Sequence, residues 1–301
     1  MTALQKRALA LKKEKNALIL AHYYQTMDIQ EIADHVCDSF EMARRARETD
    51  EGILVICGVL FMAEAAKILN PGKTVLLPSP GAGCPMADMV KPDDVIRLRG
   101  QYPDAAVVCY VNSSAAVKAV SDVCCTSSSA VNIARALPEK RIIFIPDRNL
   151  GAYVASQVPE KDVILFDGCC PIHDRAREGD VIHAKNAHPG AKLLAHPECR
   201  REILCRADYI GSTAGIIKEA LESDGKEFII GTEIGVIERL GSLAPDKRFY
   251  PLTDGFICED MKKTLLTEVV FSLENTAGDI TLNTEILEGA RRSLDRMIEL
   301  G

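Results

Sequence analysis

Several features that would assign a protein to a large functional class are missing from this sequence. No apolar run is long enough to cross a bilayer. The first residues are charged and lack the apolar stretch of a signal peptide, so we expect a cytoplasmic protein without membrane contact. The net charge of −7 argues against a nucleic-acid partner, because surfaces that bind nucleic acids normally carry a basic excess.

The eleven cysteines include no CxxC pair. That absence excludes the usual spacings of zinc ribbons and two-cluster ferredoxins. In the reducing compartment that we expect, cysteines are buried, catalytic or bound to metal rather than paired in disulfides. Any metal site must therefore take single cysteines from distant parts of the chain.

What the chain does contain is a unit that occurs three times. Three short apolar runs end in polar residues at anchors spaced by 88 and 86 positions. These anchors are His22, Tyr110 and His196. The hydroxyl-bearing residues found 17 positions after each anchor are Ser39, Ser127 and Thr213. The single cysteines found 60 to 62 positions after each anchor are Cys84, Cys170 and Cys258.

Within each unit, three apolar runs alternate with helical patterns. Short strands that alternate with helices predict parallel sheets covered by helices on both faces. We therefore expect an α/β protein of three αβα (three-layer) domains, related by pseudo-threefold symmetry, with short parallel sheets around one centre. The predicted domains are residues 1–104, 105–190 and 191–301, and the last includes an amphipathic C-terminal helix.

Each repeat cysteine follows the last apolar run of its unit. Ligands of α/β sheets bind beyond the carboxyl ends of the strands, so packing of the units would bring Cys84, Cys170 and Cys258 to one point. Three converging thiolates suit zinc or an iron–sulfur cluster. On a four-iron cluster they would leave one iron open as a Lewis acid, which favours catalysis. Cys169 lacks the Cys-Pro step that Cys170 shares with Cys84, and the other cysteines are interpreted as buried apolar residues.

Polar side chains gather at further positions of the unit. The repeat hydroxyls precede helical patterns, where they would cap the helices or help the helix N-termini to bind carboxylates and phosphate. The residues that flank the anchors are Tyr24, Asn112 and Glu198. His, Tyr and Glu are the side chains expected for proton transfer near neutral pH. Asp147 and Glu233 are interpreted as residues that orient loops or cap helices, and His173 as a donor near the metal site.

Taken in order, eleven short motifs resemble those of the quinolinate synthase family: AHYYQ, CDSFEMA, GCPMA, YVNSS, CTSSSA, PDRNLG, CCPIH, AHPEC, GSTAG, GTEIG and CEDMKK. The match extends from about Leu18 to Lys263. The resemblance implies three αβα domains around one 4Fe-4S cluster with three cysteine ligands, which by motif are Cys84, Cys170 and Cys258. It also implies that iminoaspartate and dihydroxyacetone phosphate condense to quinolinate for NAD biosynthesis, with release of phosphate and water.

The resemblance also implies roles for individual residues. Those expected to hold the substrates are His22, Ser39, Tyr110, Asn112, Ser127, His196, Glu198 and Thr213. Those expected to be catalytic are His22, Tyr24, Tyr110 and Glu198, the last three as candidates for proton transfer. The chain departs from the commoner family residues at Tyr23, Gly83 and Cys169, which lie near the expected ligands and are not among them. An enzyme that supplies iminoaspartate is the expected transient partner.

Two other functions stay open from the sequence alone. A hydro-lyase with an open-site cluster would share the three cysteines, but it would not need a phosphate pocket. A sensor or binding protein with structural zinc on the three cysteines would be colourless and stable in air. The product of the reaction and the colour of the protein distinguish these alternatives.

Overall fold

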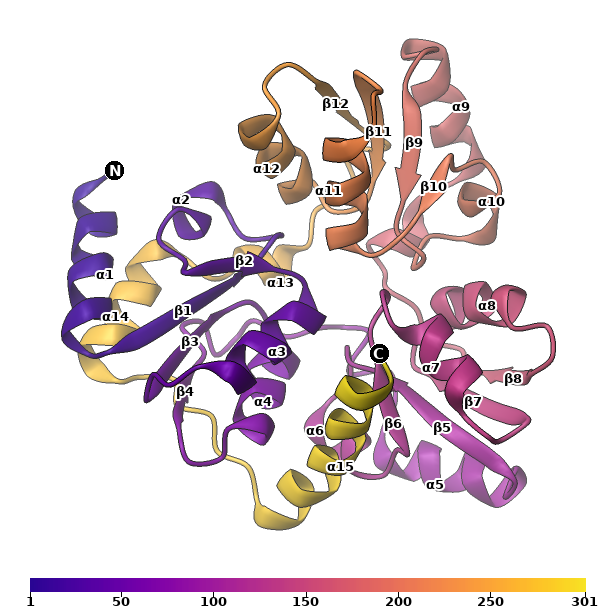
Figure 1. The fold of residues 1–301 in the computed structure, drawn as a ribbon, viewed down its shortest axis with the longest axis horizontal. Coiled ribbons are helices and arrows are strands. Elements are labelled where there is room, and N and C mark those ends of the chain that lie inside the picture. Colours follow the sequence, from indigo (N-terminus) through magenta and orange to yellow (C-terminus); the bar gives the residue numbers. More distant parts are fainter.

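The computed structural model describes residues 1–301 and shows three α/β units around a common centre (Figure 1). The first unit comprises α1 (Ala3–Glu14), β1 (Ala17–His22), α2 (Met27–Gln30), β2 (His35–Cys37), α3 (Ser39–Glu48), β3 (Ile53–Cys57), α4 (Leu60–Leu69) and β4 (Thr74–Leu76). The second comprises α5 (Pro92–Gln101), β5 (Ala105–Tyr110), α6 (Ala115–Ala119), β6 (Val123–Cys125), α7 (Ala130–Ala136), β7 (Arg141–Ile145), α8 (Arg148–Gln157) and β8 (Asp162–Leu165).

The third unit has the same alternation of helices and strands. It comprises η1 (His173–Arg175), α9 (Glu178–Ala187), β9 (Lys192–Ala195), α10 (Arg201–Leu204), β10 (Tyr209–Ile210), α11 (Thr213–Glu222), β11 (Glu227–Gly231), α12 (Gly235–Leu243) and β12 (Arg248–Pro251). The chain then ends in α13 (Glu259–Lys262), α14 (Leu266–Asn275) and α15 (Thr284–Leu300). The longest helix, α15, has 17 residues, and none of the helices combines the length and apolar character of a membrane span.

The three sheets have one topology. Their strand orders are β2-β1-β3-β4, β6-β5-β7-β8 and β10-β9-β11-β12, and all neighbouring strands are parallel. The predicted α/β class with three related parallel sheets is therefore confirmed. All residues of β1 and β5 are buried, as parallel strands covered by helices on both faces require.

Each sheet has one strand more than the sequence pattern predicted. The additional strands β2, β6 and β10 contain only two or three residues and lie at a sheet edge. The prediction of three strands per unit was wrong because segments this short cannot show an alternation of period two. They become strands by pairing with the central strand beside them.

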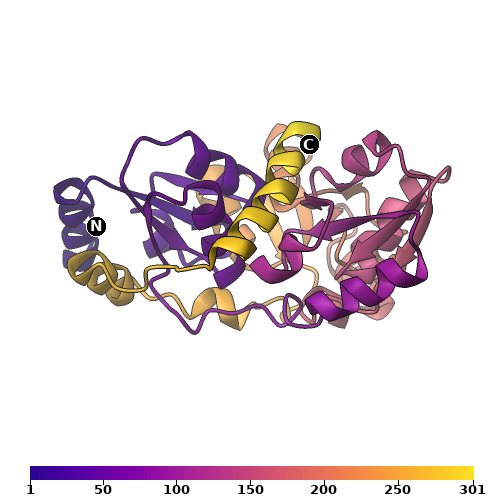
Figure 2. The same ribbon diagram turned by 90° about the horizontal axis from the view of Figure 1, so that it is seen from below.

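The C-terminal helices connect units that are distant in sequence. Helix α14 lies beside α1, and α15 packs on α4, α6 and β6, between the first and second units (Figures 1 and 2). A core of 59 buried residues includes side chains of all three units and of α15, so the units are held by shared apolar burial. The division into domains at 104 and 190 stays a prediction about independent folding.

Candidate active site

A cavity of about 400 Å³ is lined by residues of all three units, including the repeat cysteines. Cys84 follows β4, Cys170 follows β8 and Cys258 follows β12, so each comes from the loop after the last strand of its unit. The structure thus brings together the three thiols that the repeat spacing selected. Cys169 does not line this cavity, and its backbone N–H lies 3.4 Å from Met89 Sδ.

The environment of the three thiols disfavours their negatively charged form. Burial raises the pKa of Cys84 to about 12, to which neighbouring Cys258 contributes. Burial also raises the pKa of Cys258 to about 11 and the pKa of Cys170 well above its ordinary value. The chain alone therefore keeps these thiols protonated, and metal binding would release their protons. Three such thiols around a cavity much larger than one ion fit an iron–sulfur cluster.

Two buried carboxylates fix the loops that carry two of the cysteines. Asp147 Oδ1 accepts hydrogen bonds of 2.8 and 2.9 Å from the first turn of α8, and its Oδ2 accepts one of 3.3 Å from the Cys170 N–H. Glu233 likewise accepts one of 2.7 Å from the start of α12 and one of 3.3 Å from the Cys258 N–H. The interpretation of Asp147 and Glu233 as residues that orient loops is therefore confirmed.

A second cavity of about 50 Å³ adjoins the first and shares wall residues with it. Its wall contains every residue that the sequence assigned to substrate binding, namely His22, Ser39, Tyr110, Asn112, Ser127, His196, Glu198 and Thr213. Tyr24, Asn112 and Glu198 line both cavities. The thiols and the polar pocket therefore belong to one site with common wall residues.

The two histidines at the strand ends have the same fixed orientation. The Tyr24 N–H donates to His22 Nδ1 at 3.2 Å, and the Glu198 N–H donates to His196 Nδ1 at 3.3 Å. Burial lowers the pKa of His22 to about 3 and that of His196 to about 4, so both rings are neutral. With Nδ1 as acceptor, each ring carries its proton on Nε2, and His196 directs that N–H to Ser127 Oγ at 3.2 Å.

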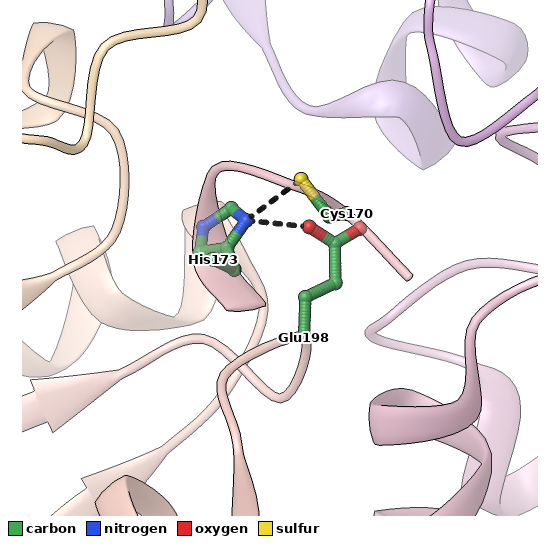
Figure 3. A group of neighbouring side chains, drawn as sticks. All are labelled: Cys170, His173 and Glu198. Carbon is green, nitrogen blue, oxygen red and sulfur yellow. Dashed lines mark hydrogen bonds and ion pairs between the residues drawn. The ribbon is translucent and has the colours of Figure 1, made fainter. Parts of the chain in front are cut away.

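Glu198 is a buried carboxylate that stays ionised. Figure 3 shows one nitrogen of the His173 ring facing both Glu198 and Cys170, with Nδ1 at 2.7 Å from Glu198 Oε2 and 3.3 Å from Cys170 Sγ. Burial opposes ionisation of Glu198, but His196, His173 and a hydrogen bond from Tyr110 lower its pKa to about 2. The ligand atoms of Cys170, His173 and Glu198 lie within 4.8 Å of one another, so this trio could also hold a single metal ion.

The repeat hydroxyls do not cap the helices that follow them, so the capping alternative was wrong, while their part in anion binding stays a prediction. Helices α3 and α11 begin at Ser39 and Thr213, and the N-caps are the preceding residues, Asp38 and Ser212. Helix α7 begins three residues after Ser127. Because Asp38 and Ser212 accept the first-turn N–H groups, the hydroxyls of Ser39 and Thr213 are left to the small cavity.

Sequence reasoning missed two residues of this site. Lys262 Nζ donates to the backbone oxygen of Tyr24 at 2.6 Å and pairs with Glu233 at 3.1 Å, which ties the end of β1 to the third unit. Thr232, directly after β11, contacts both Tyr24 and His173. Both residues lie within quoted motifs, CEDMKK and GTEIG, but neither recurs at the same position of another unit.

Comparison with known proteins agrees with this geometry. A family model described as "Quinolinate synthetase A protein" matches residues 6–299. A quinolinate synthase of Caldicellulosiruptor bescii is 54% identical over 291 residues, which cover 97% of this chain and 96% of the relative. The quinolinate synthase of Methanoregula boonei is 50% identical and covers 99% and 98%, and that of Clostridioides difficile is 50% identical and covers 96% and 95%.

Proposed function

Because this chain belongs to the quinolinate synthase family, we propose that it condenses iminoaspartate with dihydroxyacetone phosphate to form quinolinate, phosphate and water for NAD biosynthesis. The observation that carries the proposal is that the three repeat thiols and the eight predicted binding residues line two adjoining cavities with common wall residues. The eleven cysteines are all free, which suits the cytoplasm, where we place the enzyme.

Cys84, Cys170 and Cys258 would hold a 4Fe-4S cluster in the larger cavity. When bound by three thiolates, such a cluster supplies one iron without a protein ligand, which is a Lewis acid. The fit rests on the three cysteines of different units that line one cavity of about 400 Å³; burial raises the pKa of each thiol, which a bound metal would reverse. His173, at 3.3 Å from Cys170 Sγ, would be a hydrogen-bonding neighbour of that ligand.

The smaller cavity would bind the anionic groups of the substrates. The Nε2–H groups of neutral His22 and His196 are donors that suit carboxylate or phosphate oxygens. Helices α3 and α11 begin at the cavity wall with Ser39 and Thr213, whose hydroxyls can donate to an anion, and the dipole of a helix favours negative charge at its N-terminus. The Asn112 amide, which lines both cavities, would orient a substrate between them.

Proton transfer would rest on Glu198, Tyr24 and Tyr110. The ionised Glu198 carboxylate is a base that lines both cavities. Burial raises the pKa of Tyr24 and of Tyr110 well above the ordinary value, so both phenols stay neutral. A carboxylate that accepts a proton beside neutral phenols is suited to isomerisation, ring closure and dehydration.

One observation favours a different class of site. Cys170, His173 and Glu198 form a ligand trio that resembles a mononuclear zinc site, as a zinc-binding sensor or a metal-dependent hydrolase would have. The contact of 2.7 Å between His173 Nδ1 and Glu198 Oε2 already satisfies two of these ligands. Metal analysis distinguishes the alternatives, because zinc protein is colourless and keeps its metal in air.

The test is an anaerobic quinolinate assay on reconstituted protein, with iminoaspartate and dihydroxyacetone phosphate supplied together and each omitted in turn. We expect quinolinate only with both substrates, and none from Cys84→Ala, Cys170→Ala or Cys258→Ala. Cys205→Ala is the matched control, because Cys205 is exposed and outside both cavities. Brown protein that makes no quinolinate and dehydrates a hydroxy acid would support the hydro-lyase instead.

A further inference from the structure

Thr232 is a buried hydroxyl that only the third unit carries. It follows β11 directly and is 1% exposed. The equivalent positions of the other units, 19 residues after the repeat hydroxyl, are Gly58 and Pro146, which have no side-chain donor or acceptor. The hydroxyl of Thr232 is therefore not explained by the repeat, and its contacts show what it does.

The Thr232 hydroxyl contacts Tyr24, which follows β1, and His173, which follows Cys170. Its Oγ1 lies 3.0 Å from His173 Nε2 and 2.8 Å from the Tyr24 hydroxyl. The Tyr24 hydroxyl in turn lies 3.1 Å from Thr213 Oγ1. With the contact of 2.7 Å between His173 and Glu198, these groups form one unbroken chain of hydrogen bonds from Thr213 to Glu198.

Thr232 joins the Tyr24 end of this chain to the His173 end. A threonine hydroxyl has one proton and two lone pairs, so it can bond to both neighbours at once. Tyr24 and His173 are themselves buried, and the two contacts from Thr232 Oγ1 measure 2.8 and 3.0 Å.

We propose that Thr232 is a positioning residue of the reaction, which holds the Tyr24 phenol and the His173 imidazole in one fixed orientation. Tyr24 lines both cavities, so the orientation of its phenol decides how its hydroxyl meets a substrate. Loss of the Thr232 hydroxyl would leave the Tyr24 hydroxyl with the contact to Thr213 alone.

The inference rests on the proposed quinolinate synthase activity and is tested by Thr232→Val, Thr232→Ser and the control Thr264→Val. Thr264 is also 1% exposed, and its hydroxyl has no hydrogen-bond partner. We expect Thr232→Val to lower kcat by about tenfold to a hundredfold, the effect of a misplaced reacting group, with KM and iron content little changed. Thr232→Ser and Thr264→Val should retain wild-type turnover.

A double-mutant cycle with Tyr24→Phe identifies the residue through which Thr232 acts. We expect Thr232→Val to cause no further loss of kcat in the Tyr24→Phe background, whereas an independent structural role would give a further loss of the same size. Wild-type kcat in Thr232→Val, or a full additional loss in the double variant, would overturn the proposal.

Thermal melting of the same variants tests the hydrogen bonds without turnover. Thr232→Val removes one buried hydrogen-bond partner from Tyr24 and one from His173 Nε2, so it should melt below Thr264→Val. Equal melting temperatures would overturn the assigned hydrogen bonds. A wild type that makes no quinolinate would instead contradict the proposed function, so the two failures are distinguishable.

Discussion

The buried carboxylate of Asp147 offers a test of how the cysteine loops are held. Its Oδ1 caps α8 with two hydrogen bonds, and its Oδ2 accepts the Cys170 N–H at 3.3 Å. Loss of an N-cap side chain costs about 0.5–2 kcal/mol. A buried N–H left without an acceptor costs about 1–3 kcal/mol. Asp147→Ala should therefore lower the free energy of unfolding by about 1.5–5 kcal/mol.

Asp147→Asn separates the two contributions. The amide keeps an oxygen for the cap but turns its N–H₂ group towards the Cys170 N–H, so only the second cost, about 1–3 kcal/mol, applies. Asn283→Ala is the matched control, because Asn283 caps α15 through a single bond of 2.8 Å and lies outside both cavities. That variant should lose about 1 kcal/mol.

Two assays read out this series. Thermal melting of the apoprotein should rank the variants as wild type, then Asn283→Ala, then Asp147→Ala, with about 2–4 °C for each kcal/mol. The decay of the iron–sulfur absorbance in air should be faster than wild type in both Asp147 variants and unchanged in Asn283→Ala. The reasoning is refuted if Asp147→Ala melts with Asn283→Ala and keeps its iron as long as wild type.

Three further outcomes are expected. Burial lowers the pKa of His22 to about 3, whereas the unfolded chain takes up that proton near pH 6.5, so the free energy of unfolding should fall as pH drops below about 6.5. The urea midpoints measured at pH 7.5 and pH 5 should therefore differ less in His22→Gln than in wild type. An equal difference in the two proteins would contradict a neutral buried ring. Glu198→Gln should reduce kcat by about 10²–10⁴-fold with normal iron content, and full turnover would exclude Glu198 as acid or base. Cys169→Ala should keep both iron and activity, since Cys169 does not line the thiol cavity; loss of iron would move the ligand assignment to Cys169.

The repeat explains why so much of this site could be predicted from sequence. Equivalent strands of the three units end at the same edge of their sheets. Aligning the units on His22, Tyr110 and His196 therefore also places the repeat hydroxyls and cysteines at that edge. The chemistry of those positions then follows from residue type. Asp147 and Glu233 could be interpreted for the same reason, because they occupy one position of the unit.

What the sequence could not predict depends on contacts between units. Thr232 and Lys262 matter through Tyr24 of another unit, and a pattern confined to one unit carries no signal of such contacts. The strand β10, with two residues, exists only because β9 lies beside it. Likewise, the apolar stripe of α15 predicts a helix, but only the packed structure shows that it covers α6 and α4.

The central claim is that Cys84, Cys170 and Cys258 together hold one iron–sulfur cluster. The most direct measurement is the iron and acid-labile sulfide content of anaerobically reconstituted wild type, the three single Cys→Ala variants, and Cys205→Ala. We predict about four irons and four sulfides per chain in wild type and Cys205→Ala, with a marked loss in each of the other three variants. Full iron content in any of those three, or one zinc per chain in place of iron, would contradict the account.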